Sequence, residues 1–146
     1  MACPFFMPTH KSDDAGWLHP SRLPLGAGWS GHCCAPGNEG ATPSDESLKD
    51  CNLGYAASCP HLPRERSADA VRFSIARDRN SQLELSFVSE LAHRPVEHGT
   101  LIYDVVLCQW LSSHPNPCTQ KMAECYVESY LRRKAPPAET LASATA

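Results

Sequence analysis

Ala70–Phe87 reads AVRFSIARDRNSQLELSF and decides the fold of the second half of the chain. Apolar side chains alternate with polar or small ones over 70–76 and again over 82–87, and a polar turn over 77–81 separates the two runs. Alternation with period two is typical of a strand that buries one face. Two such runs across a short polar loop predict an antiparallel β-hairpin with one apolar face.

The chain between this hairpin and Pro115 allows two interpretations. We expect a loop over 93–99, a short third strand over 100–103, and then a helix that begins at Asp104 and ends before Pro115. A continuous strand over 101–108 is the alternative, because the β-branched valines in this segment favour strands.

The last helix is predicted by its cap and by its periodicity. Asn116 is a favoured N-cap residue, and Pro117 suits the first helical position. Apolar side chains then share one face as far as about Arg133, at i, i+3, i+4, i+7 and i+8 spacing: Ala123, Tyr126, Val127, Tyr130 and Leu131. This face packed on the hairpin predicts a small α+β platform over 68–134. Residues 135–146 are expected to form a disordered tail.

Residues 1–67 differ from the platform in composition, since they hold eight of the thirteen prolines and seven of the eight glycines. We expect residues 1–30 to be irregular, and a short helix over 44–50 with Ser44 as N-cap. A segment with so little regular structure needs an additional stabilising link, which we call the staple. The predicted fold class is therefore α+β: a small antiparallel hairpin or sheet packed on one or two C-terminal helices, preceded by an irregular Cys/Pro/Gly-rich metal-binding half.

The staple is predicted in residues 31–63, GHCCAPGNEGATPSDESLKDCNLGYAASCPHLP, which contain four of the eight cysteines. Thiolates gathered in one place repel one another unless a cation lies among them, so a metal explains them most simply. Because the stretch lacks the cysteine pairs, two to four residues apart, of structural zinc sites, we expect the N-terminus to fold back and add one ligand. The predicted ligands are Cys3, Cys33, Cys51 and Cys59, with Cys34 as the alternative to Cys33.

Two features favour a [4Fe–4S] cluster over zinc. Cys3 and Cys59 are each followed directly by proline, as is the last cysteine of the bacterial ferredoxin run. The predicted ligands are also far apart in the sequence and lie on glycine-rich loops, which suits a larger inorganic core. Zinc is the alternative cofactor. A metal-free thiol redox protein or enzyme, which would use the Cys33-Cys34 pair or Cys59, is the second alternative.

The other histidines and cysteines have simpler interpretations. His32 and His61 could replace a cysteine, as histidines do in Rieske centres, but we expect them to lie at the surface or beside the ligands. Cys118 and Cys125 share one face of the last helix and are expected to line the core. A second site formed by these two cysteines with Cys108 and a histidine such as His114 is the alternative.

Composition limits the classes of function. A net charge of −3 gives no electrostatic case for binding nucleic acid or an anionic membrane, and no apolar stretch is long enough to span a bilayer. The first residues, MACPFFMPTHKSDD, do not form a secretory signal, so we expect a cytoplasmic protein, in which cysteines favour metal binding over disulfides.

The sequence thus predicts a small iron–sulfur protein that uses its cluster in electron transfer, in sensing or as a structural staple. A zinc-stapled protein-interaction module is the alternative. A redox or regulatory protein partner is compatible with either, and the sequence indicates no substrate, reaction or oligomeric state.

Overall fold

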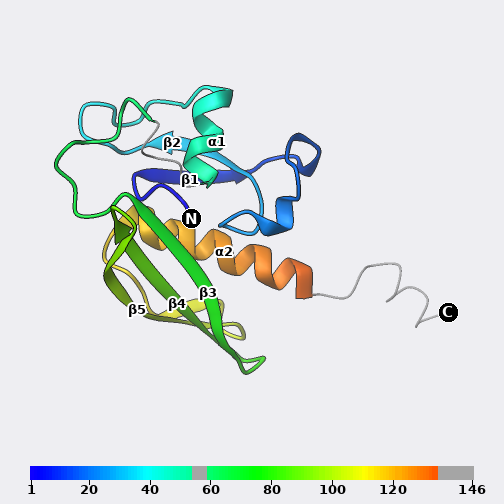
Figure 1. The fold of residues 1–146 in the computed structure, drawn as a ribbon. Helices are drawn as coiled ribbons and strands as arrows, with labels where there is room; N and C mark the ends of the chain where they lie inside the picture. Colours follow the sequence, from blue (N-terminus) through cyan, green and yellow to red (C-terminus); the bar gives the residue numbers. More distant parts are fainter. Residues whose placement is uncertain (54–58, 135–146) are drawn as a thin grey trace.

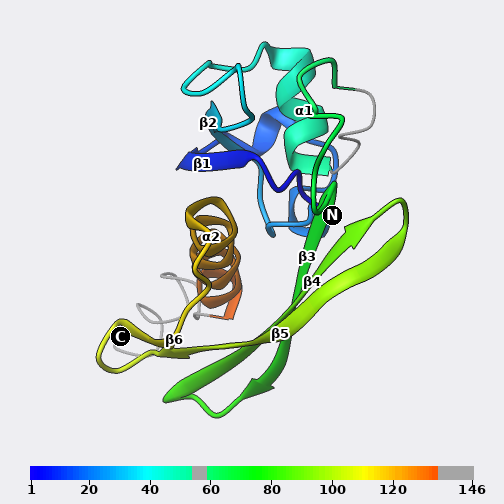
Figure 2. The same ribbon diagram turned by 90° about the vertical axis from the view of Figure 1, so that its left-hand side faces the viewer.

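A computed structural model describes residues 1–53 and 59–134 and has two antiparallel sheets on opposite sides of the C-terminal helix (Figure 1). The larger sheet has the strand order β3-β4-β5-β6, with β3 (Ala70–Asp78), β4 (Gln82–Leu91), β5 (Arg94–Asp104) and β6 (Gln109–Ser112). The smaller sheet pairs β1 (Phe6–Lys11) with β2 (Trp29–Cys33). Figure 2 looks along helix α2 (Pro117–Lys134), which lies between the two sheets.

The predicted hairpin is confirmed as β3 and β4. Phe73 pairs with Phe87 across the two strands, and the inward-facing Leu83 and Leu85 are fully buried. Asn80 takes a left-handed backbone conformation (φ 65°) in the turn, as an asparagine readily does.

The predicted loop over 93–99 is wrong, because Arg94–Gly99 forms the first half of β5. Ala92 and His93 make the preceding two-residue turn with φ values of 50° and 66°, without the glycine or asparagine that usually marks such a turn. Pro95 is tolerated in the strand because β6 pairs only with Ile102–Asp104, so the first half of β5 is a sheet edge. The predicted strand over 100–103 is confirmed as the second half of β5.

The helix predicted from Asp104 is wrong. The Asp104 carboxylate does accept a hydrogen bond from the Leu107 amide (2.8 Å), but it closes a turn, and the chain returns as β6. Cys108 leaves this turn with a φ of 53°. The alternative strand over 101–108 is correct only as far as Asp104, where β5 ends.

Helix α2 is confirmed together with its cap. The Asn116 side-chain oxygen accepts hydrogen bonds from the amides of Cys118 (2.9 Å) and Thr119 (3.1 Å). At the other end of α2, Tyr130 and Lys134 both bond to the Asp78 carboxylate at 2.6 and 2.7 Å, which ties the helix to the β3–β4 hairpin. Among the described residues, no helix has the length and apolar character needed to cross a membrane.

The first half is more regular than expected. It contains β1, β2, two short 3-10 turns, η1 (Asp14–Gly16) and η2 (Pro20–Arg22), and helix α1 (Asp45–Leu53). Helix α1 corresponds to the helix predicted over 44–50, and the Ser44 hydroxyl oxygen accepts a hydrogen bond from the Ser47 amide (3.3 Å). The tail predicted over 135–146 lies outside the described residues.

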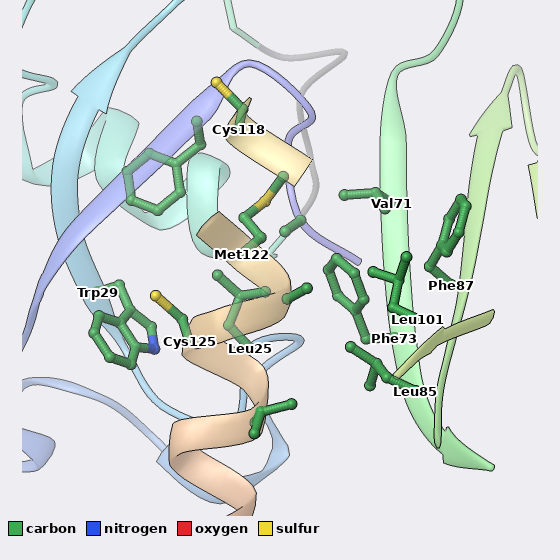
Figure 3. Close-up of a cluster of buried hydrophobic side chains, with 14 of the residues drawn as sticks. Leu25, Trp29, Val71, Phe73, Leu85, Phe87, Leu101, Cys118, Met122 and Cys125 are labelled. Carbon is green, nitrogen blue, oxygen red and sulfur yellow. The ribbon is translucent and has the colours of Figure 1, made fainter. Parts of the chain in front are cut away.

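Both halves contribute to one core around α2. Leu25 and Trp29 reach it from the first half, Met122 and Cys125 come from α2, and the larger sheet supplies the other side (Figure 3). The α+β class and the packing of the C-terminal helix on a sheet are therefore confirmed.

Candidate metal centre

The four cysteines predicted as ligands line one pocket. Cys3, Cys33, Cys51 and Cys59 surround it with Phe5, Phe6, Ala35, Asp50, His61 and Leu62. The four cysteines come from different parts of the chain, so it is the folding of the first half that brings them together.

Cys3 is held from three directions. The preceding residue, Ala2, is fully buried and forms a bridge to Val71 of β3 through two backbone hydrogen bonds of 2.7 and 2.9 Å. The Cys3 amide donates to the Cys51 carbonyl (3.0 Å), and its carbonyl accepts from the Phe6 amide (3.1 Å) to close a turn. The N-terminus thus folds back onto α1.

Adjacent cysteines separate into different surroundings at the end of β2. Cys33 lines the pocket, and its sulfur accepts a hydrogen bond from the Ala35 amide (3.3 Å). Cys34 packs on the core, where its thiol hydrogen-bonds with that of Cys118 and raises the pKa of the Cys118 thiol, after the larger effect of burial. Of the two, only Cys33 therefore lines the pocket.

Cys51 is positioned by its neighbour Asn52. The Asn52 side chain is 1% exposed, and it both accepts from the Trp29 amide and donates to the Trp29 carbonyl, each at 2.9 Å. A third bond, also of 2.9 Å, runs to the Leu48 carbonyl within α1. Asn52 therefore fixes α1 against the start of β2, and with it the place of Cys51.

Cys59 closes the pocket on its outer side. Its carbonyl accepts a hydrogen bond from the Leu62 amide (3.2 Å), which forms a turn that begins with Cys59-Pro60. Cys33, Cys51, Cys59 and His61 also line a neighbouring cavity of about 200 Å³, bounded by the loop before α1. The pocket itself holds about 20 Å³, so most of the space beside the cysteines lies in this neighbouring cavity.

The pocket disfavours thiolates unless a positive charge enters it. The pKa of the Cys3 thiol is raised to about 11, mainly by burial and in smaller part by the Cys33 and Cys59 thiols, while hydrogen bonds from the Phe5 and Phe6 amides act in the opposite direction. Burial also raises the pKa of the Cys51 thiol to about 12, with added effects of Cys3, Cys59 and Cys33. These effects place Cys3, Cys33 and Cys59 within electrostatic reach of Cys51, and Cys118 is likewise within reach of Cys3 and Cys33.

Within residues 1–53 and 59–134, no three or more His, Cys, Asp or Glu side chains form a group already arranged to hold a metal ion. The donor set still fits a thiolate-bound centre in kind, since four cysteines meet in one pocket and amides point at two of the sulfurs. Closure of the side chains around a centre would have to accompany its binding.

The remaining predicted histidines and cysteines lie in different parts of the fold. His61 lines the pocket, while His32 lies within β2, paired with Met7. Cys118 and Cys125 are buried in the core as expected, and Cys108 is exposed at the β5–β6 turn.

Sequence reasoning missed Asn52 and Ala2, which position two of the cysteines. The only available signal was a polar residue directly after Cys51 at the end of a predicted helix.

The comparisons with known proteins add no relative to this picture: no family model, no curated protein and no solved structure matches the chain.

Proposed function

We propose that this chain is a small iron–sulfur protein that binds a [4Fe–4S] cluster through Cys3, Cys33, Cys51 and Cys59. The observation that carries the proposal is that these four cysteines, up to 56 residues apart, line one pocket. Burial raises the pKa of the Cys3 and Cys51 thiols, and metal binding would supply the positive charge that stabilises their thiolates.

The surroundings of the cysteines suit such a cluster. Amide hydrogen bonds to the sulfurs of Cys3 and Cys33 favour the more negative, reduced form of a thiolate-bound cluster. The adjoining cavity of about 200 Å³ gives room beyond that of a single ion on the side of Cys33, Cys51 and Cys59. A bound cluster would supply one-electron transfer, and the chain's own part is to hold it, shield it and set its potential.

Anaerobic purification followed by iron and sulfide analysis tests the proposal. We expect about four iron and four sulfide per chain, with a broad visible absorption that dithionite bleaches. Cys51→Ser and Cys59→Ser should lose most of the iron, whereas Cys34→Ser should keep it, because Cys34 faces the core. A colourless, iron-free protein, or equal iron in all three variants, contradicts the proposal.

A single zinc ion is the second candidate. The small volume of the pocket between the four cysteines, about 20 Å³, favours it, because an ion needs less space than a cluster. The same metal analysis separates the two candidates, since zinc would give about one equivalent per chain and no sulfide.

A further inference from the structure

A groove that shares no lining residue with the cysteine pocket is unused by the proposed metal centre. It encloses about 360 Å³ between the larger sheet and α2. The sheet contributes Tyr103, Cys108 and Trp110, and the helix contributes Glu124, Val127, Glu128 and Leu131. Its two walls differ in chemistry: the sheet wall is aromatic, and the helix wall carries two carboxylates.

The sheet wall is aromatic. Tyr103 and Trp110 are paired residues of β5 and β6, and their ring centres lie 5.1 Å apart at an interplanar angle of 53°. Both rings line the groove, and aromatic rings attract cations to their faces, most strongly in the case of tryptophan.

The helix wall is acidic. Glu124 and Glu128 are four residues apart and so project from one side of α2. The Glu124 carboxylate receives a long hydrogen bond of 3.5 Å from Gln120 and lies close enough to Tyr103 to raise the pKa of its phenol, though less than burial and Cys108 do. Glu128 is bonded to Arg132 at 2.9 Å, so Glu124 is the carboxylate more available to a ligand.

The turn that leads into Cys108, one of the residues lining the groove, carries exposed apolar side chains. Val106 and Leu107 lie in the turn that joins the aromatic strands, and they are 74% and 62% exposed. At this exposure both side chains are free to contact a partner. A partner that filled the groove with a charged group would meet these two side chains beside it.

We propose that this groove binds an arginine side chain presented by a partner protein, with apolar residues of the same segment packed on Val106 and Leu107. A guanidinium is planar, stacks on aromatic rings and forms paired hydrogen bonds with a carboxylate, so it matches both walls. The negative charge of Glu124 opposes an anionic occupant. The proposal is independent of the metal centre.

A pair of peptides of nearly equal shape, one with the charged guanidinium and one with the neutral urea of citrulline, tests the site on the full chain. Acetyl-Leu-Arg-Leu-amide is titrated against acetyl-Leu-citrulline-Leu-amide, while the tryptophan indole N–H signals are followed by NMR. We expect the arginine peptide to shift the Trp110 signal and to bind at least about fivefold more tightly than the citrulline peptide. Trp17 and Trp29 lie in the first half and serve as internal controls.

Two variants and one control locate the contact. Glu124→Gln should weaken arginine-peptide binding about threefold or more, and Trp110→Leu should weaken it further. Glu46→Gln, which removes an exposed carboxylate from α1, should change nothing. Equal affinity for the two peptides, or an unchanged affinity in Glu124→Gln, overturns the proposal. A Trp110 signal that shifts with protein concentration alone would also overturn it, since a second copy of the chain would then occupy the groove.

Discussion

Replacement of Asn52 by alanine is the sharpest probe of how the cysteines are held together. The change removes three hydrogen bonds of 2.9 Å each and leaves the amide and the carbonyl of Trp29 without their side-chain partner. Trp29 is 4% exposed and Asn52 is 1% exposed, so water cannot readily replace the lost contacts.

The expected cost follows from these two stranded backbone groups. A buried donor or acceptor without a partner costs about 1–3 kcal/mol, so two of them make Asn52→Ala destabilising by about 3 kcal/mol. For a chain of this size such a loss lowers Tm by about 10 °C. Because α1 also carries Cys51, the variant should retain less metal than the wild-type protein at the same temperature.

Urea unfolding followed by circular dichroism measures the loss, and metal analysis measures the retention. Lys49→Ala, an exposed change on the same helix, is the matched control and should alter the free energy of unfolding by less than about 0.5 kcal/mol. A cost below about 1 kcal/mol for Asn52→Ala, or a cost equal to that of Lys49→Ala, would show that Asn52 does not fix α1 on β2.

Three further predictions concern other parts of the chain. Gly31→Ala should destabilise the protein by about 2 kcal/mol or more in urea unfolding, because a Cβ at this position would collide with the Met7 carbonyl oxygen in the β1–β2 pair. Hydrogen bonds from Lys134 and Tyr130 lower the pKa of Asp78 from 3.8 to about 2, so their stabilisation is complete above about pH 4 and is lost as the pH falls from 4 toward 2; Asp78→Asn should flatten the pH dependence of Tm in that window. Cys108→Ser should leave the iron content unchanged, since Cys108 is exposed at the β5–β6 turn, and a loss of iron in this variant would place a ligand there.

Local patterns account for the elements that the sequence predicted correctly. The alternation of apolar and polar residues predicted β3 and β4. The Asn116-Pro117 cap, together with the apolar face of the segment that follows it, predicted α2. In each case the signal lies within a single run of residues, so no distant contact was needed to interpret it.

The errors arose where distant contacts decide the structure. The first half of β5 contains Pro95 and follows a turn without glycine, and only its pairing with β4 makes it a strand. Strands β1 and β2 are short, and β1 has an irregularity after Pro8, so their pairing across more than 15 residues leaves no local periodicity. For the same reason the sequence could propose the four cysteines from residue type alone, but it could not distinguish Cys33 from Cys34 on firm grounds.

The position of α2 between two sheets has a consequence for the order in which the protein matures. The helix comes after every other described element in the sequence, yet it covers apolar side chains of the first half such as Phe6 and Trp29. During synthesis the apolar side chains of the first half, which carries the four cysteines of the pocket, therefore stay uncovered until residues 117–134 have left the ribosome. The bridge between Ala2 and Val71, which helps to position Cys3, likewise cannot form until Val71 has been synthesised. We thus expect the proposed metal centre to form only after residues 117–134 have been synthesised.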